Sequence, residues 1–173
     1  NTNQIERVWE QMHLAYEFGA RQIWIVNVGD IKPMEFPISF FLDYAWNPEK
    51  ISHNQLQAYT KDWSSKQFGE IFTNEIAECI ELYTKYNSRR KPELLFCDTY
   101  SLVNYREFEL VVADYKRLEN RARAIGNNLP AEYQDAFYQL VLHPIEACAN
   151  LNELYYSVGK NHFYFQQGRV LTN

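Results

Sequence analysis

The stretch RQIWIVNVGDIKPMEFP, residues 21–37, decides the fold that the sequence predicts. Residues 22–28 form a nearly continuous apolar run rich in β-branched residues, which is typical of a strand buried on both faces of a parallel sheet. Polar residues and a glycine follow, and Lys32-Pro33 leads into a helical pattern. In parallel α/β folds, ligands bind where a strand ends and its βα loop begins. We therefore predict a strand at about 22–28, followed by a ligand-binding loop.

The rest of the chain has no second strand of this quality. Apolar residues at helical spacing predict a helix before the strand, from Ile5 to about Tyr16, and another after it, from Glu35 to Trp46. A parallel strand needs parallel neighbours. We therefore expect residues 1–46 to be the end of a larger α/β domain whose other strands lie upstream.

The chain is predicted to be wholly helical after the turn Asn47-Pro48, where we place a domain boundary. Ser52 and Gln55 have the spacing of a capping box. Helices are expected over residues 52–67, 70–87 and 102–125, the last with Tyr105 on its apolar side. A bent helix follows from Pro130, with Pro144 inside it. Residues 168–173 carry neither a cap nor an apolar anchor, so we expect the bundle 47–173 to be truncated at its C-terminus.

Composition excludes several classes of partner and site. The formal net charge of −5 provides no basic field for nucleic acid. No apolar run is long enough to span a membrane. The 3 cysteines and 4 histidines lack metal-ligand spacing, so we predict no metal site and no cofactor.

The decisive stretch also carries a resemblance. WIVNVGDIKPMEFPISFFLDYAWNPEKI (24–51), KPELLFCDTYSLVNYREFE (91–109) and DAFYQLVLHPIEACANLNELYYSVGKNHFYFQQGR (135–169) resemble, in order, the end of the catalytic barrel and the helical region of glycoside hydrolase family 115. These enzymes are the xylan α-1,2-glucuronidases of bacteria and fungi. The resemblance covers nearly the whole chain.

The resemblance implies a mainly α fold: a helical bundle preceded by a helix-strand-helix remnant of a (β/α)8 barrel. It implies an inverting hydrolase that removes (4-O-methyl)glucuronic acid from glucuronoxylan or its oligosaccharides. Inverting enzymes hold two carboxylates roughly 6.5–9.5 Å apart, and the family's catalytic acids lie on earlier barrel strands. We therefore expect no catalytic residue in this segment, which should be inactive alone. A homodimer through the helical domain and a periplasmic or secreted bacterial location are further implications.

Three polar residues after the predicted strand are candidates for substrate binding: Asn27, Asp30 and Lys32. The Asn27 amide suits sugar hydroxyls or a carboxylate, although it could equally cap the loop. The resemblance favours the binding role, because an Asn at the matching position is implied in binding glucuronic acid. Lys32 suits a uronate carboxylate, but Asp30 or Glu35 could pair with it and fix the loop. Glu35 is expected to complement the dipole of its helix.

Two hypotheses from other classes remain open at this point. A helical interaction or scaffold module would make residues 17–28 helical, with Asn27 satisfying only the backbone. A non-catalytic carbohydrate-binding module would need an exposed aromatic platform, which the helical stripes do not show. Tyr100 and Tyr156 are left as aromatic candidates for stacking, whereas Tyr105 and Tyr155 are assigned to core or interface positions.

Overall fold

The structure, a computed structural model, describes residues 1–169 of the 173-residue chain, and helices dominate this part. The expected truncation at residues 168–173 falls mostly outside the described residues. The α-helices are α1 (Ile5–Glu17), α2 (Glu35–Trp46), α3 (Leu56–Phe68), α4 (Thr73–Asn87), α5 (Glu107–Gly126), α6 (Ala131–Phe137) and α7 (His143–Gln166). Shorter turns are η1 (His53–Gln55), η2 (Pro92–Leu94) and the π-helix η3 (Tyr138–Leu142). None of the described helices has the length and apolar character needed to cross a membrane.

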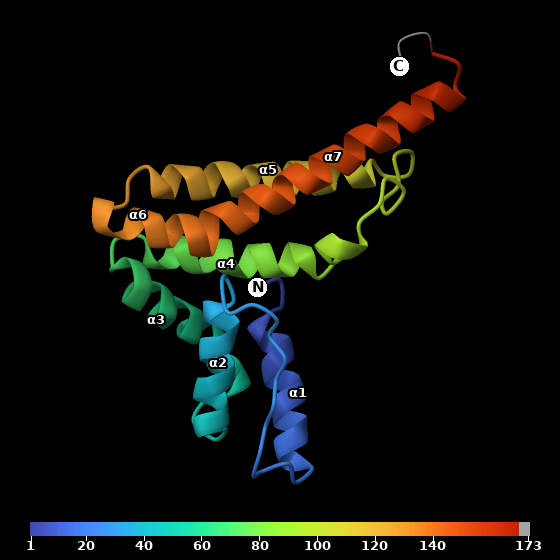
Figure 1. The fold of residues 1–173 in the computed structure, drawn as a ribbon. Coiled ribbons are helices and arrows are strands. Elements are labelled where there is room, and N and C mark those ends of the chain that lie inside the picture. The colour runs from blue at the N-terminus through green and yellow to red at the C-terminus, as the bar shows by residue number, and fades with distance from the viewer. Residues whose placement is uncertain (170–173) are drawn as a thin grey trace.

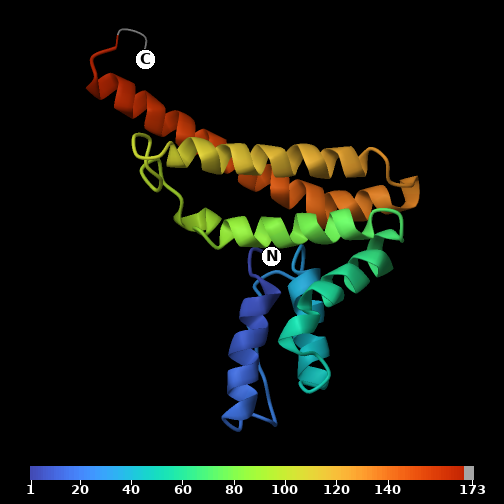
Figure 2. The same ribbon diagram turned by 180° about the vertical axis from the view of Figure 1, so that it is seen from behind.

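The long helices α4, α5 and α7 lie side by side, and α1 and α2 project from one side of this layer (Figure 1). Seen from behind, α3 connects α2 to the layer at the end near α6 (Figure 2). The mainly α fold predicted from the sequence is confirmed. The bounds of α2 agree with the predicted Glu35–Trp46, and the predicted capping box forms, because the Ser52 backbone N–H donates to Gln55 Oε1 at 2.9 Å.

The strand predicted at 22–28 is not formed within the described residues. Residues 18–34 run irregularly from the end of α1 to the start of α2, without strand pairing. Trp24 packs against the core, but Ile23 and Ile25 are 78% and 91% exposed. The physical reason is that a strand is completed by backbone hydrogen bonds to a neighbour, and residues 1–169 contain no neighbouring strand.

One apolar core runs through α2, α3, α4, α5 and α7. It includes Phe40 and Tyr44 before the predicted boundary at 46/47, and Trp63 and Ile145 after it. Phe40 and Tyr44 stack with ring centroids 6.1 Å apart, and Tyr59 meets Phe40 edge-on at 5.1 Å. The division of the chain into domains 1–46 and 47–173 stays a prediction.

The prediction that the helix continues through Pro144 is confirmed, and a π-helix lies at the position of the predicted bend. Residues 131–166 are helical throughout, with η3 inserted between α6 and α7. Pro144 lacks the N–H that an α-helix would direct at Leu140, and the wider π turn is a known way to absorb such a break. The bend keeps both Val141 and Ile145 in the core.

The helix predicted from Leu102 begins five residues later, at Glu107. Tyr105 and Arg106 before it have positive φ values of 56° and 55°. The placement of Tyr105 on an apolar helical side was wrong, because its side chain is 94% exposed. Ser101 explains the later start: its hydroxyl oxygen accepts from the backbone of Asn104 at 2.8 Å, which holds these residues in a turn.

Candidate functional site

The three predicted binding residues lie on one exposed turn between the irregular segment and α2. Asn27, Asp30 and Lys32 are all solvent-exposed. The turn is followed by Pro33 and by the first residues of α2, which anchor it to the core. Sequence reasoning located the turn correctly, but the structure joins none of the three side chains to another.

Asn27 shapes this turn through its own side chain. Its Oδ1 accepts a hydrogen bond from the backbone N–H of Gly29 at 3.0 Å, and Gly29 has a φ of 66°. This is the loop-capping role that the sequence left open beside the binding role. Within residues 1–169 the Nδ2 group of Asn27 has no hydrogen-bond partner, so it stays available as a donor.

Asp30 and Lys32 do not form the ion pair that would have fixed the loop. In the described part of the chain, no ion pair or hydrogen bond involves either residue, and Lys32 is not paired with Glu35. The turn therefore presents an amide donor, a carboxylate and an ammonium to solvent. These groups suit a ligand that carries hydroxyls and a negative charge.

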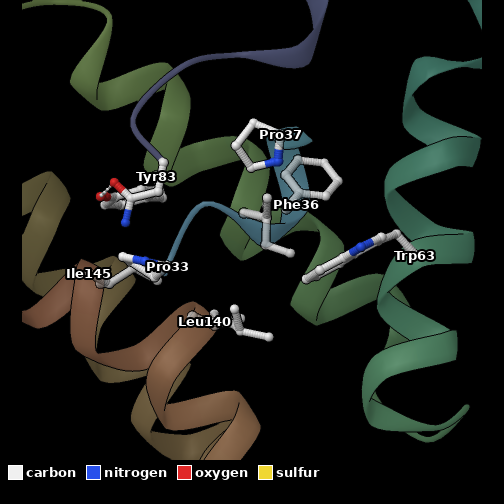
Figure 3. A pocket seen from close by; sticks show the side chains of 10 residues that line it. Pro33, Phe36, Pro37, Trp63, Tyr83, Leu140 and Ile145 are labelled. Atoms are coloured by element: carbon white, nitrogen blue, oxygen red, sulfur yellow. Dashed lines mark hydrogen bonds between the residues drawn. The ribbon is translucent and has the colours of Figure 1, made fainter. Parts of the chain in front are cut away.

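The pocket behind the turn is apolar and small. Pro33, Phe36, Trp63 and Tyr83 line it together with Leu140 and further residues of η3 and α7 (Figure 3). Its volume is about 20 Å³, enough for a single water but not for a sugar ring. Phe36 and Trp63 meet edge-on at 5.0 Å. The pocket thus belongs to the packing that supports the turn.

Glu35 makes a contact that sequence reasoning missed. Gln139 in η3 donates from Nε2 to Glu35 Oε1 at 2.8 Å, across 104 residues of sequence. The second oxygen, Oε2, is buried with no partner. The predicted role of Glu35 at the start of α2 is compatible with this contact, but no local pattern could have revealed Gln139. The bond fixes the start of α2, and with it the turn, against the helical layer.

Candidate metal ligands and the thiol of Cys79 do not extend this site. No group of three or more His, Cys, Asp or Glu side chains there is arranged to hold a metal ion. Cys79 is buried, and burial raises the pKa of its thiol to about 12, which keeps it protonated at neutral pH. The polar chemistry next to the predicted strand end is therefore confined to the turn 27–32.

Comparison with known proteins places these features in a family. Residues 1–94 match the family model described as glycosyl hydrolase family 115. One similar solved structure is a family GH115 4-O-methyl-alpha-glucuronidase with specificity for decorated arabinogalactans. It superimposes with a TM-score of 0.78 and 28% sequence identity over 87% of this chain, which corresponds to 22% of the length of that protein. A comparison with curated protein sequences gave no match.

The family match covers more than half of the chain and includes α1, the irregular segment, the turn 27–32 and α2 to α4. The structural match extends the likeness into the remaining helices. Two independent comparisons therefore agree with the resemblance seen in the sequence. This chain belongs to glycoside hydrolase family 115.

Proposed function

We propose that this chain supplies the last strand-and-helix unit of a catalytic (β/α)8 barrel, followed by a helical domain, in a larger hydrolase. The whole protein would remove (4-O-methyl)glucuronic acid from glucuronoxylan with inversion. The observation that carries the proposal is the family match over residues 1–94, which contain the exposed polar turn. The catalytic acids would lie on upstream strands, so the segment alone would be inactive.

The exposed apolar residues of the irregular segment support the barrel assignment. Ile23 and Ile25 are 78% and 91% exposed, and Phe18 at the end of α1 is 89% exposed. An extended, apolar and unpaired segment is unfavourable in water and is an edge to which another strand can add. We propose that upstream strands of the same protein cover it, which would place residues 22–28 in a parallel sheet.

In this assembly the turn 27–32 would contact the sugar. Asn27 would donate from Nδ2 to a hydroxyl or carboxylate oxygen, while its Oδ1 keeps the bond to Gly29. Lys32 would pair with the uronate carboxylate, and Asp30 would accept from a hydroxyl. None of these three groups would have to give up a bond inside residues 1–169 to reach the sugar, because the structure shows no internal partner for Asn27 Nδ2, Asp30 or Lys32 there.

The test is release of glucuronic acid by the full-length protein carrying Asn27→Ala. We expect kcat/KM to fall about 30-fold, which corresponds to about 2 kcal/mol of lost transition-state stabilisation. Asn47→Ala is the matched control, because Asn47 is also exposed and its Oδ1 accepts from the N–H of Glu49 at 3.2 Å. The control loses the same kind of turn bond, and its activity should be unchanged.

Glucuronoxylan and a decorated arabinogalactan should be compared as substrates, because the similar structure acts on the latter. Release of glucuronic acid from arabinogalactan but not from glucuronoxylan would show that the substrate is not xylan. Full activity of the Asn27→Ala protein would remove Asn27 from the site and leave the family unaffected. No release from either polymer by the unmodified protein would refute the proposed activity.

The structure contradicts the prediction made by the scaffold hypothesis. This hypothesis requires a helix over residues 17–28, whereas α1 ends at Glu17 and the following residues are irregular. That prediction was wrong. A homodimer through the helical domain stays a prediction.

A further inference from the structure

The loop 95–106, between η2 and α5, is held in a defined shape by its own bonds and by α7. The backbone N–H of Ser101 donates to Glu107 Oε2 at 2.8 Å, and the backbone N–H of Phe96 donates to Thr99 Oγ1 at 2.8 Å. Gly159 of α7 lies directly under the carbonyl of Cys97, where a side chain would not fit. The loop is at the end of the α4–α5 pair, away from α1 and α2 (Figures 1 and 2).

This loop holds a tyrosine in a conformation that tyrosine disfavours. Tyr105 has a φ of 56°, in the left-handed region, and its side chain is 94% exposed. No ring stacking or hydrogen bond of Tyr105 is found in the described part of the chain, so packing does not offset the strain. Strained residues of this kind occur preferentially at binding sites.

An open groove of about 700 Å³ lies beside the Tyr105 ring. Six residues provide the chemistry of its lining: Arg89, Tyr100, Asn104, Tyr105, Glu107 and Asp114. Arg89 is fixed, because its guanidinium bonds Asp114 Oδ2 at 2.5 Å and lies 4.6 Å from the centroid of the Tyr86 ring. The groove thus combines an unoccupied aromatic face and the Asn104 amide with a guanidinium and two carboxylates that hydrogen bonds hold in place.

We propose that this groove binds uncharged sugar units of a polysaccharide chain, with one ring stacked on Tyr105. A pyranose presents an apolar C–H face to an aromatic ring and hydroxyls at its edge, which the Asn104 amide and the two carboxylates can bond. The groove offers no free cation, because Arg89, the one cation among the lining residues, is paired with Asp114, which also pairs with Arg117 at 2.5 Å. A uronate carboxylate would therefore find no unpaired cation here, so the groove favours neutral sugars.

The inference rests on the proposed function only in taking a polysaccharide as the ligand. The two sites differ in chemistry. The turn 27–32 presents the unpaired cation Lys32 for a uronate, whereas the groove suits the unsubstituted backbone of the same polymer. A second attachment point would raise the effective concentration of the polymer near the protein without taking part in the reaction.

The test is affinity electrophoresis of the full-length protein in native gels that contain glucuronoxylan or arabinogalactan. Tyr105→Gly removes the ring, and glycine adopts the φ of 56° without strain, so the thermal midpoint should be unchanged or raised. We expect the apparent affinity for polymer to fall at least about fivefold. Tyr138→Ala is the matched control, because Tyr138 is 51% exposed on a different surface; its retardation should equal that of the unmodified protein.

Release of glucuronic acid from a short acidic oligosaccharide should be unchanged by Tyr105→Gly, and neutral xylo-oligosaccharides should compete with the polymer. Equal retardation of Tyr105→Gly and unmodified protein, or no retardation of either, would overturn the proposal. Competition by uronic-acid-bearing fragments alone would also overturn it. Loss of a dimer in light scattering on Tyr105→Gly, with polymer binding kept, would make the groove an interface between copies. Failure of the proposed activity would appear separately, as absence of released glucuronic acid.

Discussion

Replacing Gly159 by alanine should destabilise the protein, although alanine in a helix interior ordinarily stabilises. Gly159 lies in the middle of α7, where the change to alanine contributes about 1 kcal/mol in favour of the helix. The added methyl carbon would lie 2.5 Å from the backbone oxygen of Cys97, whereas such contacts essentially always exceed 3.0 Å. The outcome depends on which of these two opposing effects is larger.

The cost of the steric clash should exceed the gain in helix stability. Relief of the contact needs a shift of roughly half an ångström or more, the difference between the two distances, and the obstacle is backbone rather than a flexible side chain. Leu102 Cδ1, at 3.4 Å from the same position, limits sideways movement. Overpacking of this kind costs about 1–3 kcal/mol. A backbone obstacle places the cost in the upper part of this range, about 2–3 kcal/mol, so after the helix gain of about 1 kcal/mol is subtracted we expect the free energy of unfolding to fall by about 1–2 kcal/mol.

Urea unfolding followed by circular dichroism measures this difference, and the thermal midpoint should fall by about 2–8 °C. Gly126→Ala is the control, because the nearest atom to its added carbon is a ring carbon of Phe137 at 3.2 Å, which can yield by a few tenths of an ångström. Its stability should be unchanged or slightly higher. A Gly159→Ala protein as stable as the unmodified one would refute the close docking of loop 95–106 on α7.

Two further predictions concern buried carboxylates. Glu119 is buried and accepts hydrogen bonds from Lys116 and Arg123. Burial alone would raise the pKa of its carboxyl. The two hydrogen bonds outweigh this effect, so the pKa of Glu119 is lowered. Because the folded pKa is depressed, the stabilisation is present above the unfolded pKa of about 4.3 and is lost as the pH falls through the folded value. Glu119→Gln should therefore cost about 1 kcal/mol at pH 7, and urea titrations should show the deficit starting to shrink below about pH 4 and disappearing once the pH is below the depressed folded pKa. A deficit that did not shrink on acidification would contradict this. Gln139→Leu should lower the free energy of unfolding by about 1–3 kcal/mol, because it leaves the partly buried Glu35 carboxylate, whose Oε2 already has no partner, without its donor at Oε1. Glu35→Gln keeps an acceptor for Gln139 and should cost under about 1 kcal/mol in the same urea assay; an equal loss in both variants would argue against a specific hydrogen bond.

Local sequence determined the helices and their ends in much of this protein. Apolar spacing predicted α1 and α2, the Ser52 capping box predicted the start of the next helix, and Pro144 predicted a bend in the last one. These features depend on residues within one or two turns of each other, so a linear pattern contains the information. Family membership was also readable from sequence, because long matched segments preserve chemistry as well as pattern.

Tertiary structure decided what depends on distant partners. The run 22–28 has strand composition but pairs with nothing in the described chain, because a strand is completed only by a neighbour. Tyr105 matched the apolar spacing of a helix. The hydrogen bond from the backbone of Asn104 to Ser101 instead holds a turn, so α5 begins after Tyr105 and the Tyr105 ring is exposed. Gln139 reached Glu35 across 104 residues, a contact that no local spacing encodes. A helix forms its backbone hydrogen bonds within one segment of the chain. Strands, grooves and buried polar pairs are completed by residues far away in the sequence. Only the folded structure brings these distant residues together.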